Sequence, residues 1–153
     1  MEIALIRIDS RLIHGQVVQG WLPSLSVKEV VVVSDTAASS RLMGKMMRMS
    51  LPQEYALQVM EPSAAASYLL GEAQGKALVL VEDVSSLSRL ASAGVKLKEV
   101  IIGNTKYEES KKQYSQGVFL SADEYSLLKQ MYEETGVDFI LKTLPTSLKT
   151  RLF

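Results

Sequence analysis

Short apolar runs alternate with longer amphipathic stretches along the whole chain. Runs of β-branched and other apolar residues predict seven strands, at Glu2–Ile8, Glu29–Ser34, Leu57–Glu61, Ala77–Glu82, Glu99–Gly103, Gly117–Leu120 and Val137–Leu144. The stretches between them carry apolar residues at helical spacing and predict helices over Gln16–Leu25, Ala38–Ser50, Ser63–Gly71, Val84–Ala93 and Ala122–Thr135. Gly71, Gly94 and Gly136 stand where three of these helices are expected to end.

This alternation of strand and helix predicts an α/β fold. Right-handed crossovers would join the strands into an open, mainly parallel twisted sheet of about six to seven strands, with helices on both faces. A strand covered on both faces has no solvent side, which explains why Val30–Val33 is apolar without alternation. The polar stretch Lys106–Ser115 is expected to be a long surface loop.

Composition narrows the class of protein. A chain of 153 residues, 47% hydrophobic and 22% charged, fits one domain over residues 1–153. The 17 basic and 17 acidic residues cancel and no basic block stands out, so neither a nucleic-acid nor a membrane-surface role is indicated. With no cysteine and one histidine, neither a disulfide nor a metal centre is expected.

The absence of certain sequence patterns predicts the localisation of the protein and its lack of a cofactor. Its apolar runs are far shorter than the roughly 20 residues that span a bilayer, and the N-terminus has no signal-peptide pattern, so we expect a cytoplasmic protein. The glycines form neither a phosphate-loop spacing nor a dinucleotide-binding fingerprint, so no cofactor is expected.

Candidate chemistry is concentrated where the first predicted strand ends, the edge at which open parallel sheets bind ligands. Within eight positions, two guanidiniums (Arg7 and Arg11), the carboxylate of Asp9 and the only imidazole, His14, come together. Gly15 follows, where the backbone can approach a ligand closely. A neutral imidazole nitrogen can attack phosphorus, while arginines and free helix N–H groups neutralise phosphoryl oxygens. The segment therefore predicts a phosphoryl site with His14 as nucleophile.

The residues alone leave several alternatives open. Asp9 either orients the ring of His14 through its second N–H or pairs with an arginine. The segment could also be a surface loop held by ion pairs, without chemistry. A phosphatase or mutase would need a second acid or base, for which Asp9 and Asp35 are the candidates. A module that only binds phosphate through Arg7 and Arg11 would keep its function in His14→Ala.

The motif Arg-x-Asp-x-Arg-x-x-His-Gly-Gln-Val, read without gaps from Arg7 to Val17, resembles the phosphorylation site of sorbose-type IIB proteins of the sugar phosphotransferase system. The resemblance implies a phosphohistidine–sugar phosphotransferase. His14 would accept a phosphoryl group from a phosphorylated IIA protein and pass it to a sugar entering through membrane IIC and IID subunits. Further segments similar to the mannose/fructose/sorbose family cover nearly the whole chain: Trp21, Val30–Asp35, Lys76–Val81, Ala93–Val95 and Glu99–Gly103.

Carried over residue by residue, the resemblance assigns roles in the loop. It makes His14 the phosphorylated residue, with Asp9 and Arg11 as catalytic partners, and it favours Nδ1 as the phosphorylated nitrogen. Asp35 stands where the family has an acidic residue after the second strand and is a candidate neighbour of the site. Gly103-Asn104 replaces a glycine pair that is common after the fifth strand. The phosphate-binding neighbours it implies are Arg7, Gly15 and Gln16.

A carrier must dock with its partners in turn, so its interfaces should be small and transient. The resemblance places the protein in peripheral association with the membrane complex, and it is compatible with a homodimer; the chain itself specifies neither the oligomeric state nor the sugar. Met43, Met46 and Met47 fall on one helical face and are expected in the core, with Met49 or Arg48 as partner contacts. Trp21 is expected to anchor the core close to His14.

Overall fold

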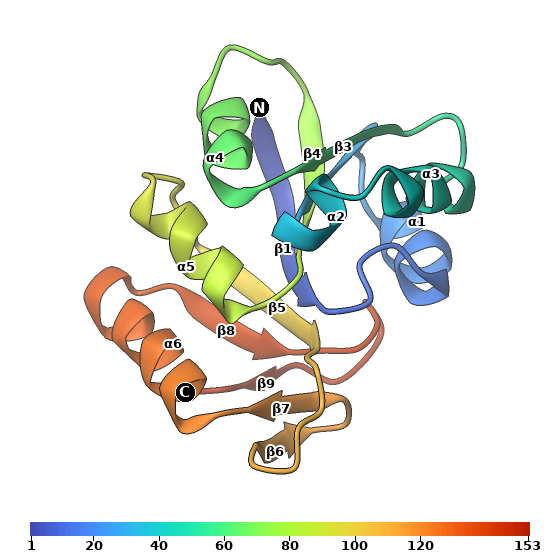
Figure 1. The fold of residues 1–153 in the computed structure, drawn as a ribbon. Coiled ribbons are helices and arrows are strands. Elements are labelled where there is room, and N and C mark those ends of the chain that lie inside the picture. The colour runs from blue at the N-terminus through green and yellow to red at the C-terminus, as the bar shows by residue number, and fades with distance from the viewer.

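The computed structural model describes all residues from 1 to 153 and confirms the predicted α/β fold (Figure 1). Seven strands form the main sheet in the order β3-β2-β4-β1-β5-β8-β9. All neighbouring strands are parallel except β9, which runs antiparallel to β8. Their bounds are β1 Glu2–Asp9, β2 Glu29–Val33, β3 Ala56–Met60, β4 Lys76–Val81, β5 Glu99–Asn104, β8 Asp138–Leu141 and β9 Thr150–Arg151.

Helices cover both faces of this sheet (Figure 1). One face packs against α4 (Pro62–Leu70), α5 (Val84–Ser92) and α6 (Ala122–Thr135) in a core cluster of 23 buried residues. The other face carries a cluster of 12 buried residues. That second cluster involves the π-helix η1 (Gln16–Trp21), α1 (Leu22–Ser24), α2 (Asp35–Ala38) and α3 (Arg41–Ser50). The β2 valines alternate between the two clusters, which is why Val30–Val33 contains no polar residue.

Two predicted helices are more complex than expected. The stretch Gln16–Leu25 begins as a π-helix and continues as the short α1. The stretch Ala38–Ser50 is divided between α2 and α3, because Ser40 has an extended backbone and its hydroxyl accepts a hydrogen bond from the amide of Met43 (3.2 Å). A serine that caps the second helix in this way ends the first one.

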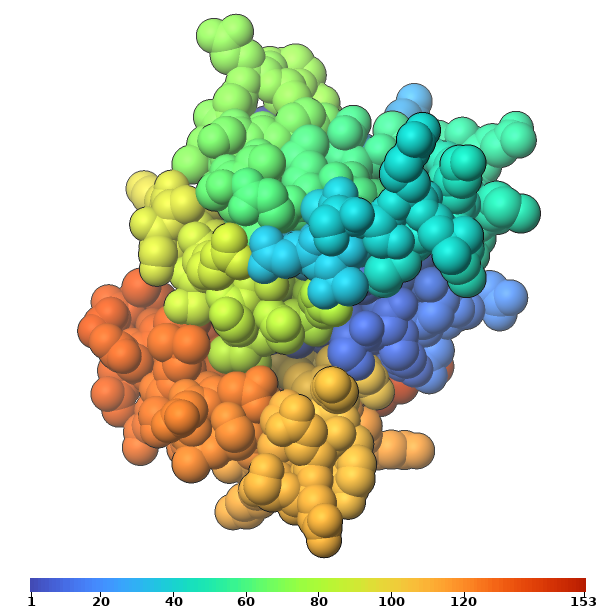
Figure 2. Space-filling model, viewed as in Figure 1, coloured from blue at the N-terminus to red at the C-terminus, as the bar shows by residue number.

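One predicted strand lies outside the main sheet. The run Gly117–Leu120 contains β7 (Val118–Leu120), which pairs antiparallel with β6 (Lys112–Ser115) in a separate hairpin. The prediction of a continuous surface loop over Lys106–Ser115 is therefore wrong at its end. Thr105 anchors the hairpin: its hydroxyl donates to the carbonyl of Phe119 (2.6 Å) and accepts from the Phe119 amide (2.7 Å). The hairpin projects at the bottom of the molecule in Figure 2.

The predicted core face of α3 is correct at two of its three methionines. Met47 is buried and Met43 packs against the second cluster, but the side chain of Met46 is 58% exposed. Met43 and Met47 are four residues apart and share one stripe, whereas Met46 lies about 100° away around the helix. None of the helices combines the length and the apolar character that a bilayer-spanning segment requires.

Candidate active site

The candidate residues lie where β1 ends, at the centre of the main sheet. β1 pairs with β4 on one side and β5 on the other, so the loop that follows it emerges at the carboxyl edge between two parallel neighbours. The loop runs from residue 10 to residue 15 and leads into η1. Buried strands on both sides thus give a rigid base to the only histidine, His14.

Asp9 is the centre of the site. This last residue of β1 is 0% exposed, yet its two carboxylate oxygens have five hydrogen-bonding partners. Oδ1 accepts from the backbone N (3.0 Å) and Nε (3.1 Å) of Arg11. Oδ2 accepts from Arg7 Nε (3.2 Å) and Arg11 Nη2 (3.1 Å), and lies 2.9 Å from His14 Nε2. Burial would raise the pKa of Asp9, but the hydrogen bonds from His14 and Arg11 outweigh it and lower the pKa to about 2.

This geometry fixes the tautomer of His14. An ionised carboxylate can only accept a hydrogen bond, so the proton of the neutral imidazole must be on Nε2, facing Asp9. Nδ1 then carries the free lone pair and has no hydrogen-bond partner in the chain. The side chain is 17% exposed, so solvent or a partner can reach it. One carboxylate thus combines both arrangements left open for Asp9, the contact with the ring and the pairing with arginines.

Arg11 is the exposed cation of the site. Its side chain is 40% exposed, and Nη2 donates both to Asp9 and to Oε1 of Gln16 (3.0 Å). Gln16, the first residue of η1, therefore holds the same nitrogen of the guanidinium that contacts Asp9. This bridge leaves Arg11 beside His14 with one edge open to solvent, where a charge-assisted contact to a phosphoryl oxygen can form.

Arg7 lies in β1 as predicted, but it is enclosed in the protein, which does not fit its predicted role as a phosphate ligand. Its side chain is 0% exposed, with Nη1 donating to the carbonyl of Lys142 (2.8 Å) and Cζ lying 5.1 Å from the centre of the Trp21 ring. Burial lowers the pKa of the guanidinium, against the raising effect of Asp9. A cation enclosed in this way lies behind Asp9, so the structure does not place Arg7 on the open side as the predicted phosphate ligand.

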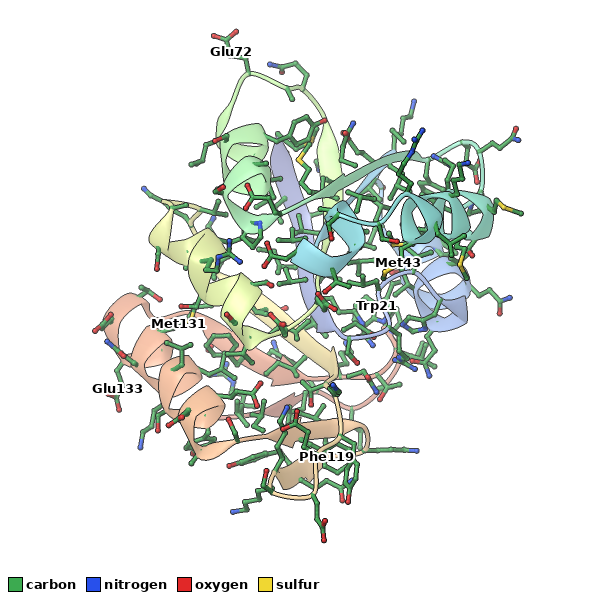
Figure 3. The ribbon with its side chains drawn as sticks, in the orientation of Figure 1. Trp21, Met43, Glu72, Phe119, Met131 and Glu133 are labelled. Atoms are coloured by element: carbon green, nitrogen blue, oxygen red, sulfur yellow. The ribbon has the colours of Figure 1, made fainter.

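Trp21 and Gly103 enclose the side chain of Arg7. Trp21, labelled in Figure 3, is 4% exposed, and its indole N–H donates to the carbonyl of Thr143 (2.9 Å). Gly103 leaves the space that the guanidinium fills, since a Cβ there would lie 2.0 Å from Arg7 Cζ. Sequence reasoning expected Trp21 near His14 but gave no signal for Gly103, because the need for glycine comes from a side chain 96 positions away.

The loop itself contains a residue in an unusual conformation. Leu12 has a positive φ of 60° although it is not a glycine, and its side chain is 4% exposed. Its amide donates to the carbonyl of Asp9 (3.0 Å), closing a tight turn just before His14. Such strain persists only when packing holds it in place, here in the cluster beneath α3. The sequence pattern did not indicate this position.

Gly15 and Asp35 differ in how they relate to this cluster. Gly15 is exposed next to His14, and its amide and that of Gln16 have no acceptor within the chain. Asp35, at the start of α2, forms an exposed ion pair with Arg89 of α5 (2.5 Å) and contacts none of the residues around Asp9. Its place as a neighbour of the site therefore stays a prediction.

A second connection joins the loop to the β6–β7 hairpin. The amide of Ser10 donates to the carbonyl of Asn104 (3.1 Å), and its hydroxyl donates to Asn104 Oδ1 (2.6 Å). On its other side, Asn104 Nδ2 would lie 3.0 Å from a Cβ at Gly117, where the chain turns into β7 with a φ of 78°. Asn104 thus lies between the loop and the hairpin, contacts both, and holds one end of the loop in place.

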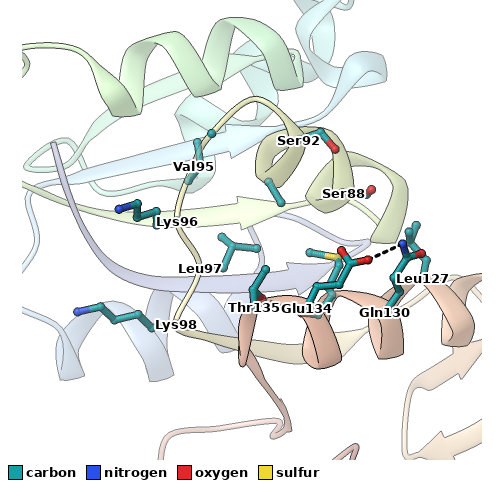
Figure 4. A pocket seen from close by; sticks show the side chains of 13 residues that line it. Ser88, Ser92, Val95, Lys96, Leu97, Lys98, Leu127, Gln130, Glu134 and Thr135 are labelled. Carbon is teal, nitrogen blue, oxygen red and sulfur yellow. Dashed lines mark hydrogen bonds between the residues drawn. The ribbon is translucent and has the colours of Figure 1, made fainter.

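A larger hollow lies away from these groups. A cavity of about 600 Å³ opens between α5 and α6, next to the segment 94–98 that precedes β5 (Figure 4). That segment is at the amino edge of the sheet, opposite the edge that carries His14. Glu134, the acidic side chain of the cavity, accepts a hydrogen bond from Gln130 (2.9 Å). The cavity therefore offers no nucleophile comparable with the imidazole.

The fold and the site together define a class: an open parallel α/β protein with an imidazole–carboxylate pair at the carboxyl edge of its central strand. Comparison with known families gives the assignment. The sequence profile of the "PTS system sorbose subfamily IIB component" family matches residues 3–152. The chain belongs to this family of phosphotransferase-system components, and so takes part in sugar transport with phosphoryl transfer.

Individual relatives agree with that assignment. The chain is 27% identical to the N-acetylgalactosamine-specific phosphotransferase enzyme IIB component 1 of Escherichia coli, over 99% of this chain and 96% of the relative. It is 25% identical to the mannose-specific EIIAB component of E. coli, over 99% of this chain but 47% of that longer protein. The crystal structure of manxB from Thermoanaerobacter tengcongensis superposes with a TM-score of 0.91 at 28% identity, covering 99% of this chain and 92% of the other.

Proposed function

We propose that this protein is a phosphocarrier that receives a phosphoryl group from a phosphorylated IIA protein on Nδ1 of His14. It then passes the group to a sugar imported through membrane IIC and IID subunits, acting at the cytoplasmic face of that complex as one domain over residues 1–153. The observation that carries the proposal is the 2.9 Å contact between His14 Nε2 and the buried carboxylate of Asp9. It leaves a single unprotonated imidazole nitrogen facing outward.

In the first half-reaction, the lone pair of Nδ1 attacks the phosphorus of the donor's phosphohistidine. The new N–P bond forms on His14 as the donor's N–P bond breaks, and the donor imidazole keeps the electron pair. His14 retains its proton on Nε2 and becomes a cation, which the carboxylate of Asp9 stabilises at 2.9 Å. No proton has to move at His14.

In the second half-reaction, the sugar hydroxyl attacks the phosphorus, and the N–P bond to His14 breaks. The electron pair returns to Nδ1, and the ring leaves as the same neutral tautomer that began the cycle. The hydroxyl proton goes to water or to a base of the acceptor. A ring that leaves as neutral imidazole is a better leaving group than an anion, so the contact with Asp9 assists both directions of transfer.

The two arginines have different parts in this proposal. Arg11, half-exposed beside the ring, contacts the phosphoryl oxygens as they pass between partner and His14. Arg7 is a positioning residue: it holds Asp9 from behind and does not touch the phosphoryl group. The amides of Gly15 and Gln16, which lack acceptors in the chain, add dipolar stabilisation on the same side.

Sugar selectivity is assigned to the membrane subunits. Relatives of 27% and 25% identity are named for N-acetylgalactosamine and for mannose, so the IIB scaffold serves more than one sugar. The mannose-specific relative also combines its A and B parts in one chain, which supports a IIA protein as the donor.

The test is intact-protein mass spectrometry after incubation with phosphoenolpyruvate, the general phosphotransferase proteins and a mannose-type IIA protein. We expect one acid-labile phosphoryl group on the wild type, none on His14→Ala, and a slowed reaction in Asp9→Asn. Arg89→Ala, which removes two exposed ion pairs outside the cluster, is the matched control and should react like the wild type. Because the chain has one histidine, a long-range proton–nitrogen correlation spectrum can assign the phosphorylated nitrogen directly.

Three outcomes would contradict the proposal. Charged IIA protein that leaves the wild type unmodified would favour a module that only binds phosphate. Full transfer activity in Asp9→Asn would show that the carboxylate neither orients nor stabilises the ring. Phosphorylation on Nε2 would mean that the ring turns away from Asp9 before it reacts.

A further inference from the structure

An apolar stripe lies exposed along one face of α3. The structure has six large hydrophobic side chains that are exposed, and three of them belong to this helix. Leu42 is 68% exposed, Met46 58% and Met49 86%. Their spacing of four and three residues places them in one row along the helix. Single exposed apolar residues are ordinary in soluble proteins, but a contiguous row is typical of a surface that another molecule covers.

Positive charge borders this row. Arg41 and Lys45 are exposed and lie one position before Leu42 and Met46, so they form the adjacent row. Arg48 continues that row, but its guanidinium donates to backbone carbonyls of the following loop, including that of Tyr55 (2.8 Å). The helix contains no acidic residue. A partner that complements this surface should therefore offer an apolar depression edged by carboxylates.

The stripe lies on the same side of the sheet as the loop that carries His14. The inward face of α3, with Met43 and Met47, belongs to the same core cluster as Leu12 and Ile13 of that loop. In Figure 2 the teal surface of α3 borders the blue surface of the loop and its helices. A protein seated on the stripe would thus lie on the same side of the sheet as the imidazole, where the partly exposed Arg11 is a further cation.

We propose that the α3 stripe, defined as Leu42, Met46 and Met49 with the flanking Arg41 and Lys45, is the docking surface for the phosphoryl donor protein; this inference rests on the proposed function. The donor arrives with a phosphoryl dianion and leaves without it. A cationic surface on the same side of the sheet as His14 attracts the charged donor more than the discharged one. After transfer the phosphoryl group on His14 offsets the local positive charge, which weakens binding to an acidic partner and favours release.

The membrane acceptor has to bind the phosphorylated protein, whereas the donor binds the unphosphorylated one. This difference favours the donor as the partner that binds the α3 stripe. A membrane acceptor must bind the phosphorylated form, in which the positive charge around His14 is already partly neutralised. The apolar row supplies contact area in both cases, and methionine side chains adapt to an irregular depression. The donor gains more from the charges of Arg41 and Lys45, because it arrives with the phosphoryl dianion still on it.

The test measures the rate of phosphorylation against the concentration of phosphorylated mannose-type IIA protein. We expect Leu42→Ser/Met46→Ser/Met49→Ser and, separately, Lys45→Glu to raise KM about tenfold while kcat stays within twofold. The side chains are exposed, so these variants should fold, as circular dichroism can verify. Leu148→Ser is the control, since Leu148 is 91% exposed but lies in the segment between β8 and β9, and its KM should equal that of the wild type.

Several results would overturn the inference. An unchanged KM in the triple variant refutes it, and a fall in kcat without a rise in KM assigns α3 to the site instead of to docking. Binding of the wild type to vesicles of anionic lipid, lost in the triple variant while KM stays constant, assigns the stripe to the membrane. A dimer lost in the same way assigns it to self-association. Failure of the wild type to be phosphorylated at all refutes the proposed function itself.

Discussion

Alanine at position 103 should destabilise this protein strongly, because the guanidinium of Arg7 occupies the space above Gly103. A Cβ at this position would lie 2.0 Å from Arg7 Cζ and Nη2 and 2.5 Å from Nη1. The guanidinium is held in place, since Nη1 donates to the carbonyl of Lys142 (2.8 Å) and Nε to Asp9 (3.2 Å). Alanine at position 103 would therefore push the buried guanidinium of Arg7 away from its hydrogen-bond partners, with no open space for it to occupy.

The magnitude follows from what is lost. Separating one partner from a fully buried ion pair costs about 3–5 kcal/mol, because the remaining charge is left without compensation. The carbonyl of the half-buried Lys142 would also lose its donor, which costs up to about 1–3 kcal/mol. Backbone shifts recover part of this, so we expect a loss of about 3–5 kcal/mol, a large share of the roughly 5–15 kcal/mol typical of a domain.

Urea unfolding measures this loss as a shift of the midpoint at constant slope. Gly44→Ala is the matched control: no atom lies within 4 Å of a Cβ there, and the position is inside α3, so it should stabilise by about 0.5–1 kcal/mol. In an Arg7→Met background the steric cause is gone, and the cost of Gly103→Ala should fall by at least about 2 kcal/mol. An equal cost in both backgrounds, or a cost below about 1 kcal/mol, would refute the reasoning.

Three further outcomes are expected. The pKa of Asp9 is lowered from 3.8 to about 2, so the ionised carboxylate adds about 2 kcal/mol to the free energy of unfolding above pH 4. This contribution is lost as the pH falls toward 2, so the acid unfolding curves of the wild type and Asp9→Asn should converge there. The hydrogen bond to Glu29 and burial raise the pKa of Tyr68 to about 12, so an alkaline absorbance titration should lose a late-ionising tyrosine in Tyr68→Phe. Arg89→Ala should change stability by less than about 1 kcal/mol, since its partners are exposed, and a larger change in urea unfolding would contradict this.

The fold could be predicted from the sequence because its parallel strands are apolar on both faces and its helices have clear ends. Gly136 ends α6 with a φ of 74°, as the pattern of residues indicated, and Ser121 and Glu124 cap the start of that helix reciprocally. One exception is β7, whose apolar run is short and pairs with polar β6 in a hairpin. A run of three residues does not reveal which sheet it joins, since its partner is decided by tertiary packing.

The sequence predicted which residues form the site but not how their side chains are placed relative to one another. The spacing of Asp9, Arg11 and His14 indicated that they would meet, because they leave one strand within a few positions. The two arginines were not distinguishable from spacing alone. Arg7 lies within β1 and points into the protein, whereas Arg11 lies in the loop, and only the packing of Trp21 and Gly103 determines that difference.

The hydrogen bond between Arg7 and the carbonyl of Lys142 joins residues 135 positions apart. A contact between residues so far apart in the sequence can form only after the intervening chain has folded, so we expect it to form late in folding. The early residues of the motif therefore do not form a functional pocket by themselves. A peptide covering β1 and its loop would carry every reactive group of the site and still lack the enclosure that positions Asp9.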